Sequence, residues 1–138
     1  MKPSEIWKNK QYKNKDKFGI YVKNRRKELG LTIKDFAEKL NLSPAYICDI
    51  ENGKRLAPLG CLDKIVSTLK IEENEVNFFY DLVGCSHSNW QDLNEYFAKN
   101  PNAREFFRLA QKQDLSDEEV ANLILSMRTK IDEQENEA

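Results

Sequence analysis

Two short helical segments stand on either side of a tight turn between residues 32 and 53. Thr32 is a good N-cap, and Asp35 three residues later completes a variant of the capping box. The first segment then shows an apolar face with helical spacing, at Ile33, Phe36, Ala37 and Leu40. After a turn at Asn41 and Leu42, a second helix is predicted to begin at Ser43. Two helices this short and this close must pack on each other, which predicts a helix-turn-helix layout.

The second segment has its own start and stop signals. Ser43 is a strong N-cap and Pro44 occupies the first helical position, where its missing N–H costs nothing. Ile47 and Ile50 form the inner face, and Asn52 with Gly53 ends the helix.

Three further helices complete a five-helix domain over residues 18–84. The first begins at Phe18 and ends before Gly30, the second covers residues 61–69, and the third covers residues 73–83 and ends at Gly84. Residues 1–17 are polar and rich in Lys and Asn, and we expect a flexible basic arm there. Such an arm either wraps a polyanion or serves as a disordered, solubilising tail.

Residues 85–138 predict a smaller helical module after a polar linker at residues 84–88. Ser88 can cap a helix that Asn100 and Pro101 end, and Ser116 with Glu119 forms a capping box for a last helix. That helix carries a heptad-like stripe of Val120, Ile124, Met127 and Ile131. We expect this stripe to mediate dimerisation, the alternative being a monomeric helical cap. The fold class is therefore all-α.

Charge is divided unevenly along a chain of net charge −1. Residues 1–70 hold 16 Lys and Arg against 8 Asp and Glu, whereas residues 71–138 hold 6 against 15. A basic half is attracted to DNA because it releases condensed counterions, and the acidic half should sit away from the phosphates. The sequence contains neither a secretory signal nor a run of apolar residues long enough to span a membrane, so we expect a cytoplasmic protein.

The stretch from Leu31 to Arg55 resembles the helix-turn-helix of the Xre family, the lambda-repressor-like and Cro-like regulators of bacteria and phages. The resemblance extends from Phe18 to roughly Asn74 and is carried by Ala37, Leu42, Ile47, Ile50, Glu51, Asn52, Gly53 and Pro58. It implies a lambda-repressor-like DNA-binding domain. The family usually has Gly where this chain has Asn41, because the turn needs a positive φ, and Asn tolerates that conformation next best.

The resemblance also implies the site residues. The helix from Ser43 would enter the major groove of double-stranded DNA, with Pro44, Ala45, Tyr46 and Asp49 as the residues that contact bases. For Tyr46, packing against the preceding helix is the alternative. The residues implied to contact the DNA backbone are Thr32, Lys34, Ser43, Asn52, Lys54 and Arg55. Arg26 and Glu51 match a family pair that forms a largely buried salt bridge, although surface positions are possible for both.

An enzyme is not indicated. The single histidine, His87, forms with Cys85 too small a set for a metal site, and no Gly-rich phosphate loop occurs. We therefore expect no catalytic residue, metal or cofactor, and Cys48 as a redox sensor is a minor alternative. The prediction is a sequence-specific transcriptional regulator, a repressor that binds a two-fold operator as a homodimer. The alternative is an antitoxin or anti-regulator whose C-terminal helices bind a protein partner.

Overall fold

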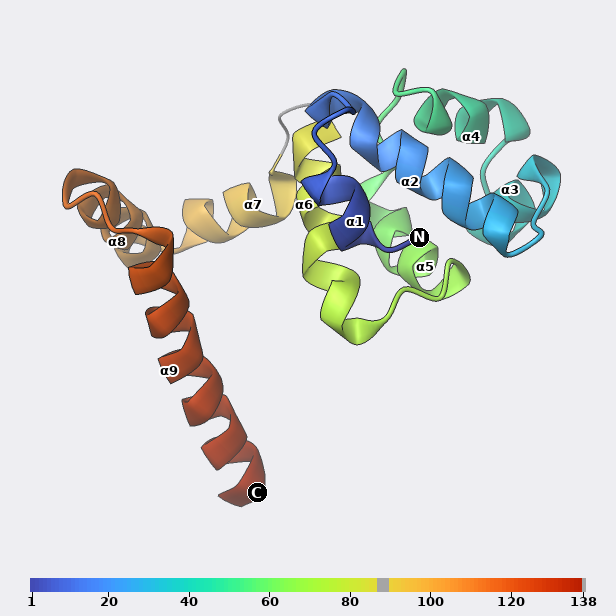
Figure 1. Cartoon of the computed structure of the whole chain (residues 1–138). Coiled ribbons are helices and arrows are strands. Elements are labelled where there is room, and N and C mark those ends of the chain that lie inside the picture. The colour runs from blue at the N-terminus through green and yellow to red at the C-terminus, as the bar shows by residue number, and fades with distance from the viewer. Residues whose placement is uncertain (87–89, 138) are drawn as a thin grey trace. The chain divides into compact units, whose positions relative to one another are not determined.

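The computed structural model describes residues 1–86 and 90–137 (Figure 1). All regular structure in these residues is helical, and they contain no strand, which confirms the all-α fold class. The chain divides into two compact units, Met1–Gln91 and Asp92–Ala138.

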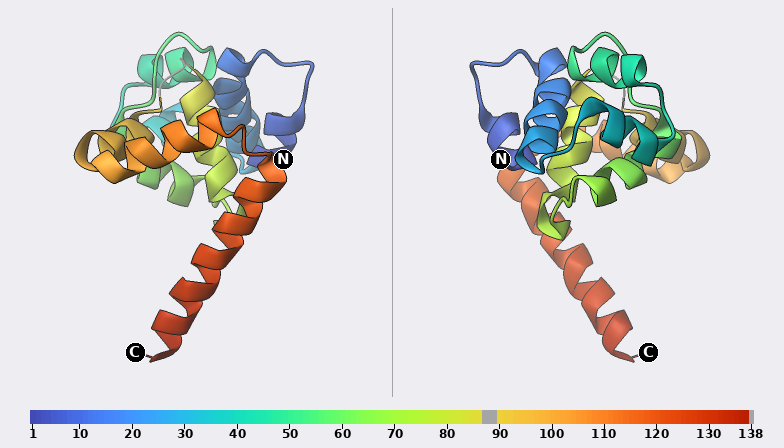
Figure 2. Two further views of the ribbon diagram at one scale, coloured as in Figure 1. Left: turned by 90° about the vertical axis from the view of Figure 1, so that its left-hand side faces the viewer. Right: turned by 90° about the vertical axis from the view of Figure 1, so that its right-hand side faces the viewer.

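The first unit contains six α-helices and two 3₁₀ turns among its described residues. They are α1 (Pro3–Lys8), α2 (Asn14–Glu28), α3 (Ile33–Leu40), α4 (Pro44–Glu51), η1 (Leu59–Cys61), α5 (Leu62–Thr68), η2 (Glu73–Glu75) and α6 (Val76–Ser86). The long helix α2 packs on α6 and also on α4, while α3 packs on α4 and α5 (Figure 2). The Phe18 and Phe79 rings meet between α2 and α6, with their centroids 5.6 Å apart.

The N-terminal segment differs from the flexible arm that the sequence predicts. Residues 3–8 form α1, which packs on α2 and α6 and buries Ile6 completely. The Lys17 ammonium group donates to the Trp7 carbonyl oxygen at 2.7 Å. Ser4 donates through its N–H and its hydroxyl to the two carboxylate oxygens of Glu75. One buried apolar side chain and a few hydrogen bonds therefore hold this lysine-rich segment against α2 and α6.

The end of α6 also differs from the prediction. The helix passes through Gly84 and continues to Ser86. A Cβ atom at Gly84 would overlap the Trp90 ring, so this glycine allows a close approach of the indole instead of ending the helix. Trp90 consequently belongs to the first unit, whereas we placed it in the second module. His87 and Ser88, which we assigned to a linker and a helix cap, lie outside the described residues.

The second unit contains α7 (Gln91–Lys99), α8 (Pro101–Lys112) and α9 (Asp117–Glu137). Ser116 accepts a hydrogen bond from the Glu119 N–H at the start of α9, as the capping box predicts. Phe97 and Phe107 join α7 to α8, with ring centroids 4.8 Å apart. None of the residues described between 93 and 136 is buried. This unit therefore has aromatic contacts but no interior of its own.

Candidate nucleic-acid interface

The turn between α3 and α4 has the geometry that its sequence predicts. Thr32 accepts from the Asp35 N–H at 3.0 Å, and Ser43 accepts from the Tyr46 N–H at 3.1 Å, so both helices are capped by a hydroxyl. Asn41 adopts the left-handed conformation with φ of 56°, and the Leu42 N–H then bonds to the Ala37 carbonyl at 2.9 Å. The capped turn fixes the angle between the two helices.

A buried ion pair holds α4 against α2. Arg26 donates from Nε to Glu51 at 2.6 Å and from Nη2 to the second carboxylate oxygen at 3.3 Å. A third bond runs from Arg26 to the Leu31 carbonyl at 2.8 Å. Both side chains are less than 10% exposed. The pair that the resemblance implies, Arg26 and Glu51, thus joins α2 to the inner side of α4, the side that also carries the buried Ile47 and Ile50.

A close backbone contact, which our reading of the sequence missed, also supports α4. A Cβ atom at Gly19 on α2 would lie 2.5 Å from the Glu51 carbonyl oxygen and 2.7 Å from that of Ile50. Only glycine lets the C-terminal end of α4 approach α2 this closely. The sequence pattern begins this helix at Phe18, whereas in the structure α2 begins at Asn14, so that Gly19 lies well inside the helix.

The outward residues of α4 divide into two groups. Pro44 and Ala45 in the first turn are exposed. Tyr46 is half-buried, and its hydroxyl donates to the Leu56 carbonyl at 3.3 Å. The Arg55 guanidinium lies 4.8 Å from the centre of the Tyr46 ring and forms an ion pair with the Asp49 carboxylate at 3.4 Å. Four predicted contact residues therefore lie on this surface, but Tyr46 and Asp49 are engaged by the loop that follows α4.

The residues assigned to the DNA backbone lie at the ends of α3 and α4. Thr32, Lys34, Ser43, Asn52, Lys54 and Arg55 are all exposed. The Thr32 N–H donates to the Asp35 carboxylate at 3.3 Å, so the acidic side chain occupies part of the α3 N-terminus that we offered to a phosphate. The N–H groups of Ile33 and Lys34 have no acceptor within the helix, because they belong to its first turn.

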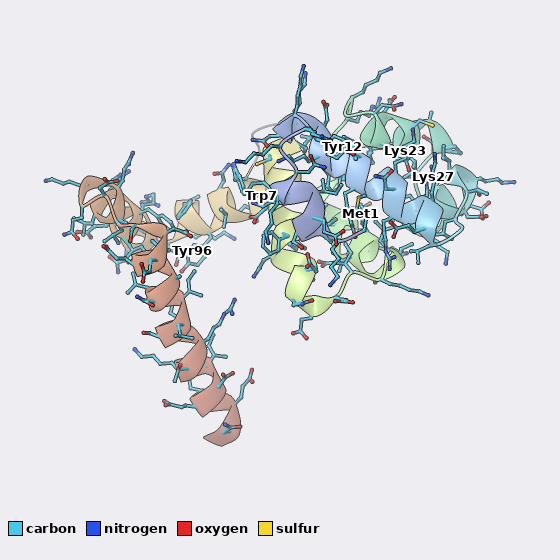
Figure 3. The ribbon with its side chains drawn as sticks, in the orientation of Figure 1. Met1, Trp7, Tyr12, Lys23, Lys27 and Tyr96 are labelled. Carbon is cyan, nitrogen blue, oxygen red and sulfur yellow. The ribbon has the colours of Figure 1, made fainter. Side chains whose placement is uncertain are left out.

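Further cations lie on α2, the helix that carries Arg26. Lys23 and Lys27 are exposed there, and Figure 3 shows their side chains. Near the start of α2, the Asp16 carboxylate lies beside Gly53, which has a φ of 75° and ends α4. Gly53 and Lys54 close that end by donating to the Ile50 and Asp49 carbonyl oxygens. The loop that presents Lys54 and Arg55 is thereby fixed to α4 and adjoins α2.

The stripe assigned to dimerisation lies on α9, in the second unit. Val120, Ile124, Met127 and Ile131 are between 36% and 63% exposed. The first three line an apolar groove with residues of α7 and α8. Each of these four side chains therefore has apolar surface that the described part of the unit leaves uncovered.

The remaining candidates from the sequence are the cysteines and a possible metal site. Cys48, Cys61 and Cys85 are half-buried free thiols, and burial raises the pKa of the Cys85 thiol. Within the described residues, no three His, Cys, Asp or Glu side chains lie close enough together to hold a metal ion. No helix in the same part of the chain is long and apolar enough to cross a membrane.

Comparison with known families finds a similarity over the segment that contains the α3–α4 pair. The family described as helix-turn-helix matches residues 22–76. Residues 22–76 are therefore similar to the helix-turn-helix family, in agreement with the resemblance to the Xre regulators. The match covers α3, α4, α5 and residues 22–28 of α2, while α1 and the second unit lie outside it.

One relative from a phage matches part of the chain. The chain is 34% identical over 58 residues to the ImmF control region 10 kDa protein of Bacillus phage phi105. The aligned segment is 42% of this chain and spans about 64% of the length of that relative. No solved structure matches.

Proposed function

We propose that this chain is a sequence-specific DNA-binding transcriptional regulator, acting in the cytoplasm as a repressor that binds a two-fold operator as a dimer. The observation that carries the proposal is the setting of α4. Its first turn, with Pro44 and Ala45, is exposed, while Arg26, Glu51 and Gly19 fix its inner side. A rigid helix with an exposed N-terminal turn suits insertion into the major groove. Similarity to a protein named for a phage control region supports a regulatory role.

The chemistry of the surface favours apolar and cytosine contacts over guanine reading. Pro44 and Ala45 offer only apolar contact, which suits a thymine methyl group. Asp49 can accept from a cytosine amino group, and Arg55 offsets its charge near the phosphates. Tyr46 contributes by supporting Arg55, since its own hydroxyl is bonded to Leu56.

Backbone contacts would come from the ends of the same two helices. Lys34 and Lys54 add charge, while Ser43, Asn52 and the first-turn N–H groups of α3 add hydrogen-bond donors. Neutralising phosphates in this way releases counterions, so affinity for DNA should fall steeply as salt rises.

The experiment is a titration of mixed-sequence duplex DNA at several salt concentrations. We expect a steep negative slope of log K against log salt for the wild-type chain. Lys54→Ala and Arg55→Ala should each weaken binding to all duplexes and reduce the slope by about 1. Lys64→Ala, an exposed lysine on α5, is the matched control and should leave the slope unchanged. No binding even at low salt would contradict the proposal.

The repressor and the two-fold operator need separate measurements. Duplexes selected from a random pool should share an inverted repeat, with half-sites about 34 Å apart. A reporter placed behind the selected site should be expressed less when the protein is present. A selected site without a repeat would contradict the dimeric operator, and increased expression would contradict the repressor role.

The second candidate, an antitoxin or anti-regulator, is favoured by one observation. The exposed apolar groove of the second unit offers a surface for a protein partner. Co-purification as an obligate heteromer, together with absence of DNA binding at low salt, would select this function over the first.

A further inference from the structure

The second unit exposes an apolar groove that its own helices do not fill. The groove has a volume of about 690 Å³ and lies among α7, α8 and the first half of α9. The residues that line it include Tyr96, labelled in Figure 3, and Phe106, Phe107, Val120, Ile124 and Met127. Helices that bury so little apolar surface are not expected to be stable alone in water, and an exposed apolar face of this kind is typical of an interaction site.

The apolar stripe of α9 continues beyond the groove. Ile131, one turn after Met127, belongs to the same stripe and is 51% exposed. The C-terminal half of α9 extends past α8 in Figures 1 and 2. Each copy of the chain therefore has both an apolar groove and a projecting helix half whose apolar stripe, Met127 and Ile131, could lie against such a groove.

Charge along α9 is arranged in three blocks. The first turn is acidic, with Asp117, Glu118 and Glu119. Arg128 and Lys130 form a basic block in the middle, and residues 132–137 are again acidic. With about 3.6 residues per turn, Asp117 and Arg128 lie along one edge of the apolar stripe. Glu119 and Lys130 lie along the other edge.

We propose that the groove is occupied by α9 of a second copy, paired antiparallel to the first α9 about a two-fold axis near Ile124. This inference rests on the proposed dimer and specifies its interface. In this register Asp117 meets Arg128 of the second copy, and Glu119 meets Lys130. The two-fold axis repeats both pairs, so that each copy gives and receives the same contacts. The projecting half of each α9, with Met127 and Ile131, lies against the groove of the other copy.

The alternative pairing of two α9 helices is less favourable. In a parallel, in-register pair, each of the three charge blocks would face the same block of the second copy. Acidic first turns would then face each other, and so would the two basic blocks. Like charges brought together at an interface are destabilising, so the block pattern selects the antiparallel register.

The test is a charge exchange within α9, measured by sedimentation equilibrium of the full chain without DNA at low salt. Arg128→Glu/Lys130→Glu should weaken dimerisation by about tenfold or more, because attractive pairs become repulsive. Adding Asp117→Lys/Glu119→Lys to the same chain should restore the dimer, because all four pairs are attractive again. The control Lys39→Glu/Lys64→Glu makes the same change in net charge within the first unit and should leave dimerisation unchanged.

The possible outcomes separate the interface from the proposed function. A parallel pair would leave Arg128→Glu/Lys130→Glu as strong a dimer as the wild type, and that result overturns the register. Failure of the fourfold variant to restore the dimer, with its helix content intact by circular dichroism, overturns it as well. A wild-type chain that is monomeric at every concentration rejects the dimer itself. None of these results bears on DNA binding, which the salt titration tests separately.

Discussion

The two units have similar helical patterns but use their apolar residues in opposite ways. In the first unit, Val22, Ile47, Leu69 and Phe79 are completely buried. In the second, the large apolar side chains Phe107, Leu125 and Met127 are 55–63% exposed. A helical apolar stripe therefore predicts that a face will be covered, but it does not say whether the same chain covers it.

This contrast follows from how the helices are connected in space. Helix α2 touches α1, α4 and α6, so its apolar residues meet neighbours on several sides. The second unit has three helices, and one of them extends past the others. Burial of apolar surface is the main favourable term in folding, so we expect the first unit to be stable alone and the second to depend on assembly.

The largest effect on the first unit should come from its buried ion pair. Arg26→Ala leaves the Glu51 carboxylate buried without its partner, which should lower the free energy of unfolding by about 3–5 kcal/mol. Arg55→Ala, which breaks an exposed Arg–Asp pair, is the matched control and should cost about 0–1 kcal/mol. Urea unfolding, monitored by tryptophan fluorescence, measures the free energy of unfolding of both variants. Equal losses would show that the pair is not what holds α4 to α2.

The features predicted correctly from the sequence are those set by neighbouring residues. The caps at Thr32 and Ser43, and the left-handed Asn41, depend on a few side chains close in the chain. Such signals are the same wherever the segment finally packs. For this reason the helix-turn-helix could be placed to within about a residue at each end.

The features that the sequence did not reveal depend on distant contacts. The sequence predicts that Gly84 ends a helix, whereas in the structure this glycine makes room for the Trp90 ring. The sequence predicts a flexible arm for the segment that contains Ser4, because Glu75, which accepts its hydrogen bonds, lies 71 residues away. In the candidate interface, the Tyr46 hydroxyl donates to the Leu56 carbonyl oxygen, a contact that the sequence did not reveal. These contacts exist only once the helices have packed.

Substitution of Gly19 tests how closely α4 packs against α2. Gly19→Ala places a methyl group against the Glu51 and Ile50 carbonyl oxygens, and neither backbone atom can move without moving α4. We expect a loss of about 1–3 kcal/mol in the free energy of unfolding, even though Ala favours helices. Gly60→Ala, where nothing lies within 4 Å of the added carbon, is the control. A Gly19→Ala chain as stable as the control would remove this contact from the account of α4.

The free energy of unfolding of the first unit should also decrease at alkaline pH. Burial raises the pKa of Tyr21 to about 12. The folded state therefore prefers the protonated phenol, which adds to the free energy of unfolding. This stabilisation is fully present below the unfolded pKa near 10, and it is lost as the pH rises toward about 12. Between pH 10 and 12, the free energy of unfolding of the wild type should fall by about 1–3 kcal/mol relative to that of Tyr21→Phe. Urea unfolding at several alkaline pH values measures the difference. The exposed Tyr96→Phe should show no such pH-dependent difference from the wild type.

The smallest expected effect on the first unit comes from a drastic change in the second. Trp7 and Trp90 both belong to the first unit, so tryptophan fluorescence follows that unit alone, whereas far-ultraviolet circular dichroism follows both. Ile124→Asp puts a charge in the apolar stripe of α9 and should lower the helix content and the tendency to dimerise. The fluorescence-detected free energy of unfolding should stay within about 0.5 kcal/mol of the wild type.

Asn122→Asp adds the same charge to α9 away from the stripe, and it should change neither signal. In the wild type, the circular dichroism transition of the second unit should move to higher temperature with protein concentration, because assembly stabilises only the associated form. The fluorescence transition should not move. If Ile124→Asp destabilised the first unit as strongly as Arg26→Ala, the two units would share their stability, and the contrast between a self-sufficient unit and a dependent one would fail.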